Sequence, residues 1–192
     1  MKAYSGFESK PSGRKMGPLP AGGYVAVVKA VKLEGKEPDQ SLIIRMDVAE
    51  GDYKDYFMQR YMAEKKKGTY EPRYKGDFRL RVYNVDNKKA QYPESDKARF
   101  EDAIWRFEQS NPGFHWAWDE QQLVGLTIGI NMQAGEYNGN PYTRIGRLEV
   151  AQDVRNGKVT TMKPREPRSD AYEPPVDQQT GFVQVEDDDV PF

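Results

Sequence analysis

Basic and aromatic side chains recur together through the middle of the chain, in a pattern typical of proteins that bind a single nucleic-acid strand. Aromatic rings stack on unpaired bases whatever their identity, and Lys or Arg pairs with phosphates. In residues 78–83, apolar residues alternate with Arg79, Arg81 and Tyr83. A strand there would present two guanidiniums and a phenol on one face. The residues predicted to contact DNA are Tyr56, Arg60, Tyr61, Lys65, Lys67, Tyr70, Arg73, Tyr74, Lys75, Arg79, Arg81, Tyr83, Trp116, Tyr137, Tyr142 and Arg144.

Each of these aromatic residues also has an ordinary structural interpretation. A tyrosine in a strand often packs its ring in the core and leaves the hydroxyl in water. Trp116 and Trp118 flank Ala117, and we expect at least one of the two to cover the end of the domain. His115 has no partner residues for a metal site in the sequence, so we expect a structural role for it.

A second candidate binding element is the acidic run that ends in Val-Pro-Phe. A basic-rimmed apolar pocket on a partner protein could take the Phe192 ring, and the carboxylates would steer the encounter. The alternative is an acidic segment without a partner. The residues predicted to bind a partner are Asp187, Asp188, Asp189, Val190, Pro191 and Phe192.

The sequence contains few of the residue types and motifs on which enzymatic catalysis usually depends. The chain has no Cys and one His, which excludes thiol catalysis and Cys/His zinc sites. Carboxylates within residues 47–55 could hold Mg²⁺ as in metal-dependent nucleases, but solvated turn charges explain them equally well. No Gly-rich phosphate-binding motif follows a predicted strand. We therefore expect no enzymatic activity, no cofactor and no bound metal.

The net charge of −1 conceals an asymmetry between two parts of the chain. From Pro164 onward, two basic residues stand against eight acidic ones, a charge of −6 that leaves +5 on residues 1–163. A basic body is suited to holding a polyanion, while an acidic tail is suited to a different partner or to competing for the same surface.

The hydrophobic pattern predicts a mainly β domain with one long helix. In the helix, Phe100, Ala103, Ile104 and Phe107 recur at helical spacing. Residues 53–62 are interpreted as extended, with a long exposed loop over 64–76. One helix between the third and fourth strands indicates a five-stranded OB-fold barrel; ubiquitin-like and SH3-like arrangements are the alternatives. The strands are predicted at 24–33, 41–49, 78–83, 126–132 and 142–150, and the helix at 95–110.

The composition places one folded domain between two flexible ends. We expect a flexible arm over residues 1–23, the binding domain over 24–159 and a disordered acidic tail over 160–192. Neither a signal-peptide core near the start nor a run of about 18 apolar residues is present in the sequence. A soluble, cytoplasmic protein is therefore expected.

Two parts of the sequence resemble single-stranded DNA-binding proteins. Residues 187–192 are similar to the acidic end of the bacterial proteins, with Val190 where that family has Ile. The body resembles the single-stranded DNA-binding proteins of phages and mobile elements of Gram-positive hosts. That second resemblance is carried by LPAGGY (19–24), DVAEGDY (47–53), SNPGF (110–114), WAWD (116–119) and EYNG (136–139).

The resemblance implies an OB-fold that binds single-stranded DNA without sequence preference and recruits replication, recombination or repair proteins through residues 187–192. The body departs from the housekeeping bacterial protein, so that protein's tetramer does not carry over and a homo-oligomer stays open. Two alternatives also stay open: a strand-annealing or recombination-mediator protein, and an adaptor that uses the acidic end without binding DNA.

Overall fold

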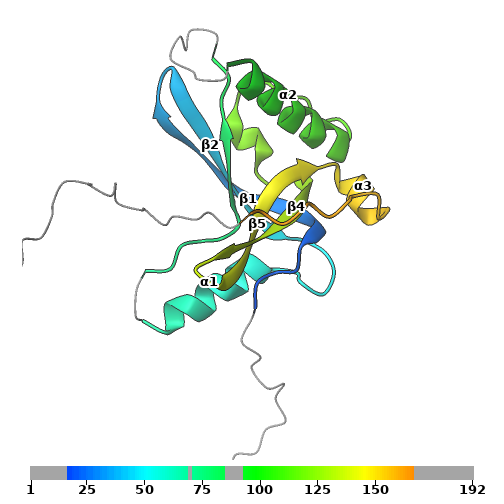
Figure 1. Ribbon diagram of the computed structural model, residues 1–192. Helices are drawn as coiled ribbons and strands as arrows, with labels where there is room; N and C mark the ends of the chain where they lie inside the picture. Colours follow the sequence, from blue (N-terminus) through cyan, green and yellow to red (C-terminus); the bar gives the residue numbers. More distant parts are fainter. Residues whose placement is uncertain (1–16, 69–70, 85–92, 167–192) are drawn as a thin grey trace, which may run out of the picture.

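The computed structural model describes residues 17–68, 71–84 and 93–166. Five strands form one antiparallel sheet in the order β3-β2-β1-β4-β5 (Figure 1). The elements are β1 (Gly22–Lys36), β2 (Asp39–Val48), α1 (Tyr56–Lys66), β3 (Asp77–Arg81), α2 (Pro93–Ser110), the 3-10 helix η1 (Glu120–Leu123), β4 (Thr127–Tyr137), β5 (Asn140–Glu149) and α3 (Ala151–Arg155).

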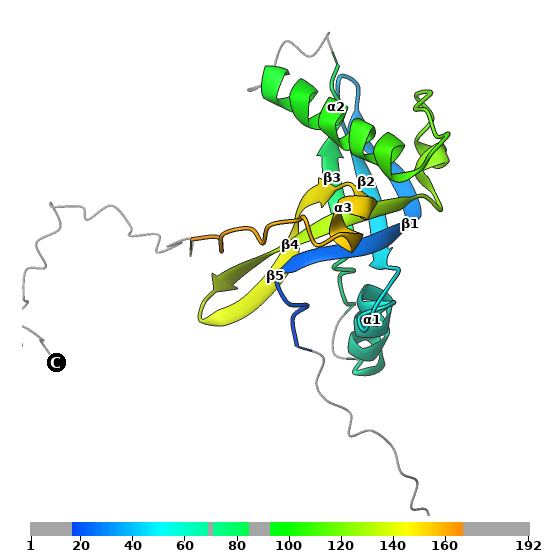
Figure 2. The same ribbon diagram turned by 90° about the vertical axis from the view of Figure 1, so that its right-hand side faces the viewer.

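The mainly β class and the helix between the third and fourth strands are confirmed. Within the described residues, no pairing joins β3 to β5, so the sheet is open along these two edges. Figure 2 shows α2 across one end of the sheet and α1 at the other end. No helix in the described ranges is long and apolar enough to cross a membrane.

Alternating residues of the strands and one face of α2 build the core. Ile44, Met46 and Val48 of β2 are fully buried, as their spacing predicts. Ile130 of β4 and Phe107 of α2 are fully buried as well. Burial of these side chains is the main stabilising contribution to the sheet-and-helix arrangement, at about 1.5–3 kcal/mol for each large apolar side chain.

The prediction of an extended stretch over 53–62 is wrong, because Tyr56–Lys66 form helix α1. The cause is the fully buried Asp47 of β2. Its Oδ1 accepts a hydrogen bond from the backbone N–H of Phe57 at 2.9 Å, and its Oδ2 accepts one from Met58 at 3.0 Å. These bonds satisfy backbone donors in the first turn of the helix. The predicted loop over 64–76 accordingly begins only after Lys66.

Both ends of the predicted domain extend further than 24–159. Leu19, assigned to the flexible arm, is 1% exposed, and its carbonyl accepts a hydrogen bond from Thr143 Oγ1 at 2.7 Å. Beyond 159, the Asn131 amide donates to the Thr160 carbonyl at 3.0 Å. The Arg165 N–H donates to the Ala134 carbonyl at 2.9 Å. Residues 160–165, assigned to the tail, thus lie along β4.

Candidate nucleic-acid interface

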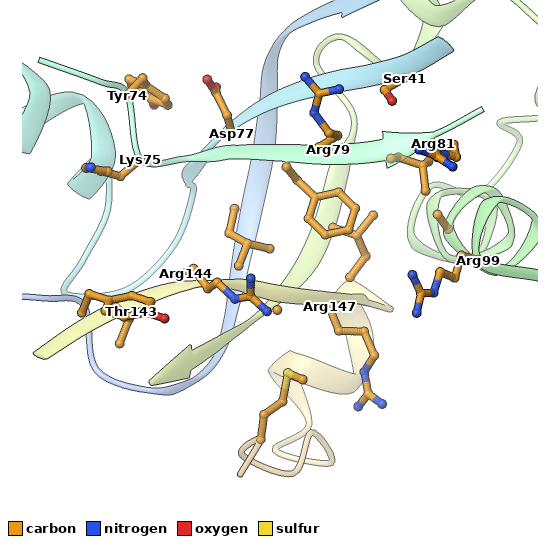
Figure 3. A pocket seen from close by; sticks show the side chains of 18 of the residues that line it. Ser41, Tyr74, Lys75, Asp77, Arg79, Arg81, Arg99, Thr143, Arg144 and Arg147 are labelled. Atoms are coloured by element: carbon orange, nitrogen blue, oxygen red, sulfur yellow. The ribbon is translucent and has the colours of Figure 1, made fainter. Parts of the chain in front are cut away.

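The open edges of β3 and β5 border a groove of about 1170 Å³ (Figure 3). Helix α2 contributes one end of its lining through Arg99 and Ala103. Phe78, Leu80 and Leu148 supply apolar surface. The groove exists because the outer edge of β3 does not pair with β5 in the described residues.

Basic side chains dominate the polar part of this lining. Eight Lys or Arg residues and three Asp residues line the groove, so its charge is strongly positive. A surface of this kind attracts polyanions over distances of about one Debye length. The basic residues are Arg60, Arg73, Lys75, Arg79, Arg81, Arg99, Arg144 and Arg147, and the acidic ones are Asp77, Asp96 and Asp102.

Four of the eight cations are already paired with carboxylates. On β3, Arg79 forms an ion pair with Glu34, and its side chain is turned away from β5 in Figure 3. Arg81 lies 3.3 Å from Asp96 and 3.7 Å from Asp39. The other two paired cations are Arg60, at 3.0 Å from Glu64, and Arg147, whose Nε donates to Glu149 at 2.7 Å.

The other four cations have no carboxylate partner among the described residues: Arg73, Lys75, Arg99 and Arg144. Arg144 makes one long hydrogen bond, 3.4 Å, to the amide oxygen of Gln133. Figure 3 shows the Arg99 side chain extending from α2 toward the space between β3 and β5, and the Arg144 side chain lying along β5 at the border of that space. These four side chains can pair with phosphates without first losing an ion pair. They are therefore the cations of the groove best able to bind a polyanion.

Besides the buried Tyr74, two half-buried aromatic rings line the groove next to these cations. Phe78 is half-buried, and Tyr142 is half-buried at the start of β5. Tyr142 pairs across the sheet with Gly135. A Cβ added at Gly135 would lie 2.6 Å from Cζ of Tyr142, so the missing side chain makes room for the ring. Both rings are placed to stack on bases.

Two of the tyrosines predicted to contact DNA are core residues instead. Tyr56 is 4% exposed, and its hydroxyl donates to the Gly17 carbonyl at 2.6 Å. Tyr74 is 6% exposed, and its hydroxyl donates to the Met46 carbonyl at 3.1 Å. Burial, reinforced by the nearby Asp47, raises the pKa of Tyr74. Neither ring has a face available to a base.

Other predicted residues lie around the groove rather than in it. Tyr61 packs beside Tyr74 with ring centroids 5.9 Å apart, and the Lys65 ammonium lies 5.9 Å from the Tyr61 ring. Lys67 is exposed at the end of α1. Tyr83 follows β3 and packs against the core, with the Lys97 ammonium 5.8 Å from its ring.

The tryptophans form a separate cluster outside the groove lining. Trp116 packs against the core with its ring centroid 6.3 Å from that of Phe100. Trp118 is 70% exposed and stacks on Phe100 at 5.8 Å. Trp116 therefore helps cover the core, as expected for one of the pair.

Three further predictions concern one residue outside the groove and two parts of the chain outside the described residues. Tyr137 is 56% exposed near the β4–β5 hairpin and does not line the groove. Tyr70 lies outside the described residues, as does the whole acidic run Asp187–Phe192.

Three basic or aromatic residues that line the groove were missed by the sequence analysis: Phe78, Arg99 and Arg147. Phe78 was predicted to be buried, because alternation does not reveal that one edge of β3 is unpaired. Arg99 sits beside the apolar stripe of α2. For Arg147 the sequence signal was Gly146, because a glycine inside a strand often marks a bulge. In the structure the register pairs Met132 with Ile145 and Asn131 with Arg147, and skips Gly146. This bulge reverses side-chain parity and brings Arg144 and Arg147 to the same groove.

Two of the four carboxylates considered for a metal site, Asp47 and Glu50, have structural partners. Asp47 caps α1. Glu50 pairs with Arg155 at 2.7 Å, and hydrogen bonding to that guanidinium lowers the pKa of Glu50. Over residues 17–68, 71–84 and 93–166, no group of three or more His, Cys, Asp or Glu side chains is arranged to hold a metal ion.

No known protein-family model matches the sequence, and a search of curated proteins gives no match. The chemistry of the groove is therefore the basis for assigning a function.

Proposed function

We propose that this chain binds single-stranded DNA in the groove between β3 and β5. The observation that supports this most strongly is the set of four cations without carboxylate partners around an apolar, aromatic surface. Phosphates of a strand pair with Arg73, Lys75, Arg99 and Arg144. Its bases stack on Phe78 and Tyr142, which tolerate any base.

The same arrangement favours a single strand over a duplex. In a duplex the bases already stack on one another, and their faces are closed to Phe78 and Tyr142. A duplex would gain the phosphate contacts but not the stacking, which is worth about 1–3 kcal/mol per base. We expect discrimination of at least tenfold between the two forms, since each tenfold corresponds to about 1.4 kcal/mol.

The strand order supports an OB-fold that is open at one seam. The order β3-β2-β1-β4-β5, with α2 between β3 and β4, is what a five-stranded Greek-key barrel gives when its third and fifth strands separate. OB-folds are often only partly closed and bind oligonucleotides across their strands. In this proposal the groove is the seam, widened enough to admit a strand.

We assign recruitment of a protein partner to Asp187–Phe192. Its acidic residues and Val-Pro-Phe resemble the partner-binding end of bacterial single-stranded DNA-binding proteins. Tethering such a segment to a DNA-bound body raises the partner's local concentration on the strand. The two activities are separable, because the phosphate contacts lie wholly in the body.

The direct test is titration of a fluorescein-labelled dT oligonucleotide with the full chain, followed by anisotropy at low and moderate salt. A duplex of the same length is the control. The proposal expects tight, salt-dependent binding of the single strand and weaker binding of the duplex. Absence of binding at low salt would overturn it and leave the acidic segment as the only binding element.

A further inference from the structure

A smaller pocket of about 330 Å³ adjoins the groove between α1 and the segment that leads into β3. It shares Arg73, Tyr74 and Asp77 with the groove, so the two spaces lie side by side. Its remaining lining includes Arg45, Met58 and Tyr61. Its volume is at the small end of ligand pockets.

The walls of this pocket suit a flat aromatic ligand. Tyr61 is half-buried, so part of its ring stays accessible, and Met58 is 42% exposed. Met packs well against aromatic rings because its thioether is flexible and polarisable. The Arg45 guanidinium lies 4.7 Å from the Tyr74 ring centroid and adds a planar cation. These are surfaces on which a base stacks.

One side of the pocket carries a fixed pair of donor and acceptor groups. Arg45 donates from Nε to Asp77 Oδ1 at 2.8 Å and from Nη2 to Oδ2 at 3.0 Å. Such bidentate pairing holds both groups in one plane. It leaves the Nη1 hydrogens of Arg45 and further lone pairs on Asp77 for a ligand.

We propose that this pocket binds one nucleobase that carries an exocyclic amino group, from a strand whose backbone lies in the groove. The inference rests on the proposed function. The Asp77 carboxylate accepts a hydrogen bond from the amino group of cytosine, adenine or guanine, as carboxylates do with cytosine N4. Thymine has no amino group and lacks this contact. Binding is thus insensitive to sequence along most of the strand and selective at one position.

The test is a position scan with labelled dT oligonucleotides, each carrying a single dC. At one position, we expect affinity at least about fivefold above that of the all-dT strand. Tyr61→Leu is expected to weaken binding of that dC-containing strand about fivefold, because the stacking contact is lost. Tyr61→Phe keeps the ring and should keep the affinity. Asp77→Asn is expected to reduce the preference for dC. Trp105→Leu removes another exposed aromatic from α2, outside both spaces, and is the matched control.

The outcomes separate this inference from the proposed function. If all-dT and every dC-containing strand bind equally tightly, the pocket inference is wrong while the groove proposal stands. A preference for dC that survives both Tyr61→Leu and Asp77→Asn, in variants with unchanged thermal unfolding, also overturns it. If no oligonucleotide binds at low salt, both proposals fail together.

Discussion

The cations of the groove fall into two groups that differ in their partners. Arg79 and Arg81 on β3 are paired with carboxylates, whereas Arg99 and Arg144 line the groove without a carboxylate partner among the described residues. Both groups look alike in a count of charges. The difference shows that the field a polyanion meets is set by ion pairing within the protein.

The paired group is not inert, because its Arg79–Glu34 ion pair is exposed. The Arg79 side chain is 61% exposed and that of Glu34 is 43% exposed. Exposed pairs are worth about 0–1 kcal/mol, so a phosphate can displace the carboxylate at little cost. The displaced carboxylate nevertheless stays nearby and repels the phosphate. The paired arginines should therefore contribute little net affinity, and matched substitutions in the two groups can test this.

The largest effect is expected from Arg99→Gln combined with Arg144→Gln. A hydrogen bond to a charged group is worth about 1.5–3 kcal/mol, so losing both contacts should weaken binding of a dT oligonucleotide by about 100-fold or more. Fluorescence anisotropy at low salt measures this. A change below about fivefold would mean that the strand does not pass between β3 and β5.

A smaller effect is expected from Phe78→Leu, which keeps the groove apolar but removes the ring. The loss of one stacked base should weaken binding about fivefold or more, with little change in salt dependence. Oligonucleotide titration at two salt concentrations measures both quantities. An unchanged affinity would show that the groove holds the backbone alone.

Neutralising the carboxylates that pair with the β3 arginines should raise the affinity for the oligonucleotide rather than lower it. Glu34→Gln with Asp96→Asn frees Arg79, leaves Arg81 with only its longer contact to Asp39, and removes two negative charges near the strand. We expect affinity to rise about threefold, because each exposed pair contributes at most about 1 kcal/mol. A fall in affinity would contradict the account, provided that circular dichroism shows an intact fold.

The smallest effect is expected from Arg79→Gln with Arg81→Gln. This matches the Arg99/Arg144 double substitution in number and chemistry, but replaces arginines that are paired with carboxylates. Affinity for the dT oligonucleotide should change by less than about threefold. A loss of affinity as large as that of Arg99→Gln with Arg144→Gln would contradict the distinction between paired and unpaired cations.

Periodicity was enough to predict most of the sheet and α2, since residues such as Ile44, Ile130 and Phe107 are buried where their spacing places them. It failed at α1, whose first turn is capped by Asp47 from β2, a contact that no local pattern contains. It also failed to separate Tyr74, which is buried, from Tyr142, which is half-buried. Tyr74 is buried by contacts with Phe57 and Tyr61 of α1, which no local pattern contains.

The same limit applies to the charged residues. Alternation correctly placed Arg79 and Arg81 on the exposed side of β3, where both are exposed. It could not show that Glu34 and Asp96 reach them from β1 and α2. Ion pairing across elements is a tertiary property, so the sequence indicated a basic surface without indicating which of its cations are free to bind phosphate.

The most direct test of the central claim is the salt dependence of binding to a dT oligonucleotide. For single strands, the slope of log K against log salt is about −0.7 per phosphate neutralised, so four unpaired cations predict about −3 and all eight would give about −6. Arg99→Gln with Arg144→Gln should bring the slope to about −1.5, while Arg79→Gln with Arg81→Gln should leave it near −3. A wild-type slope near −6, or an equal fall in both double variants, would contradict the account.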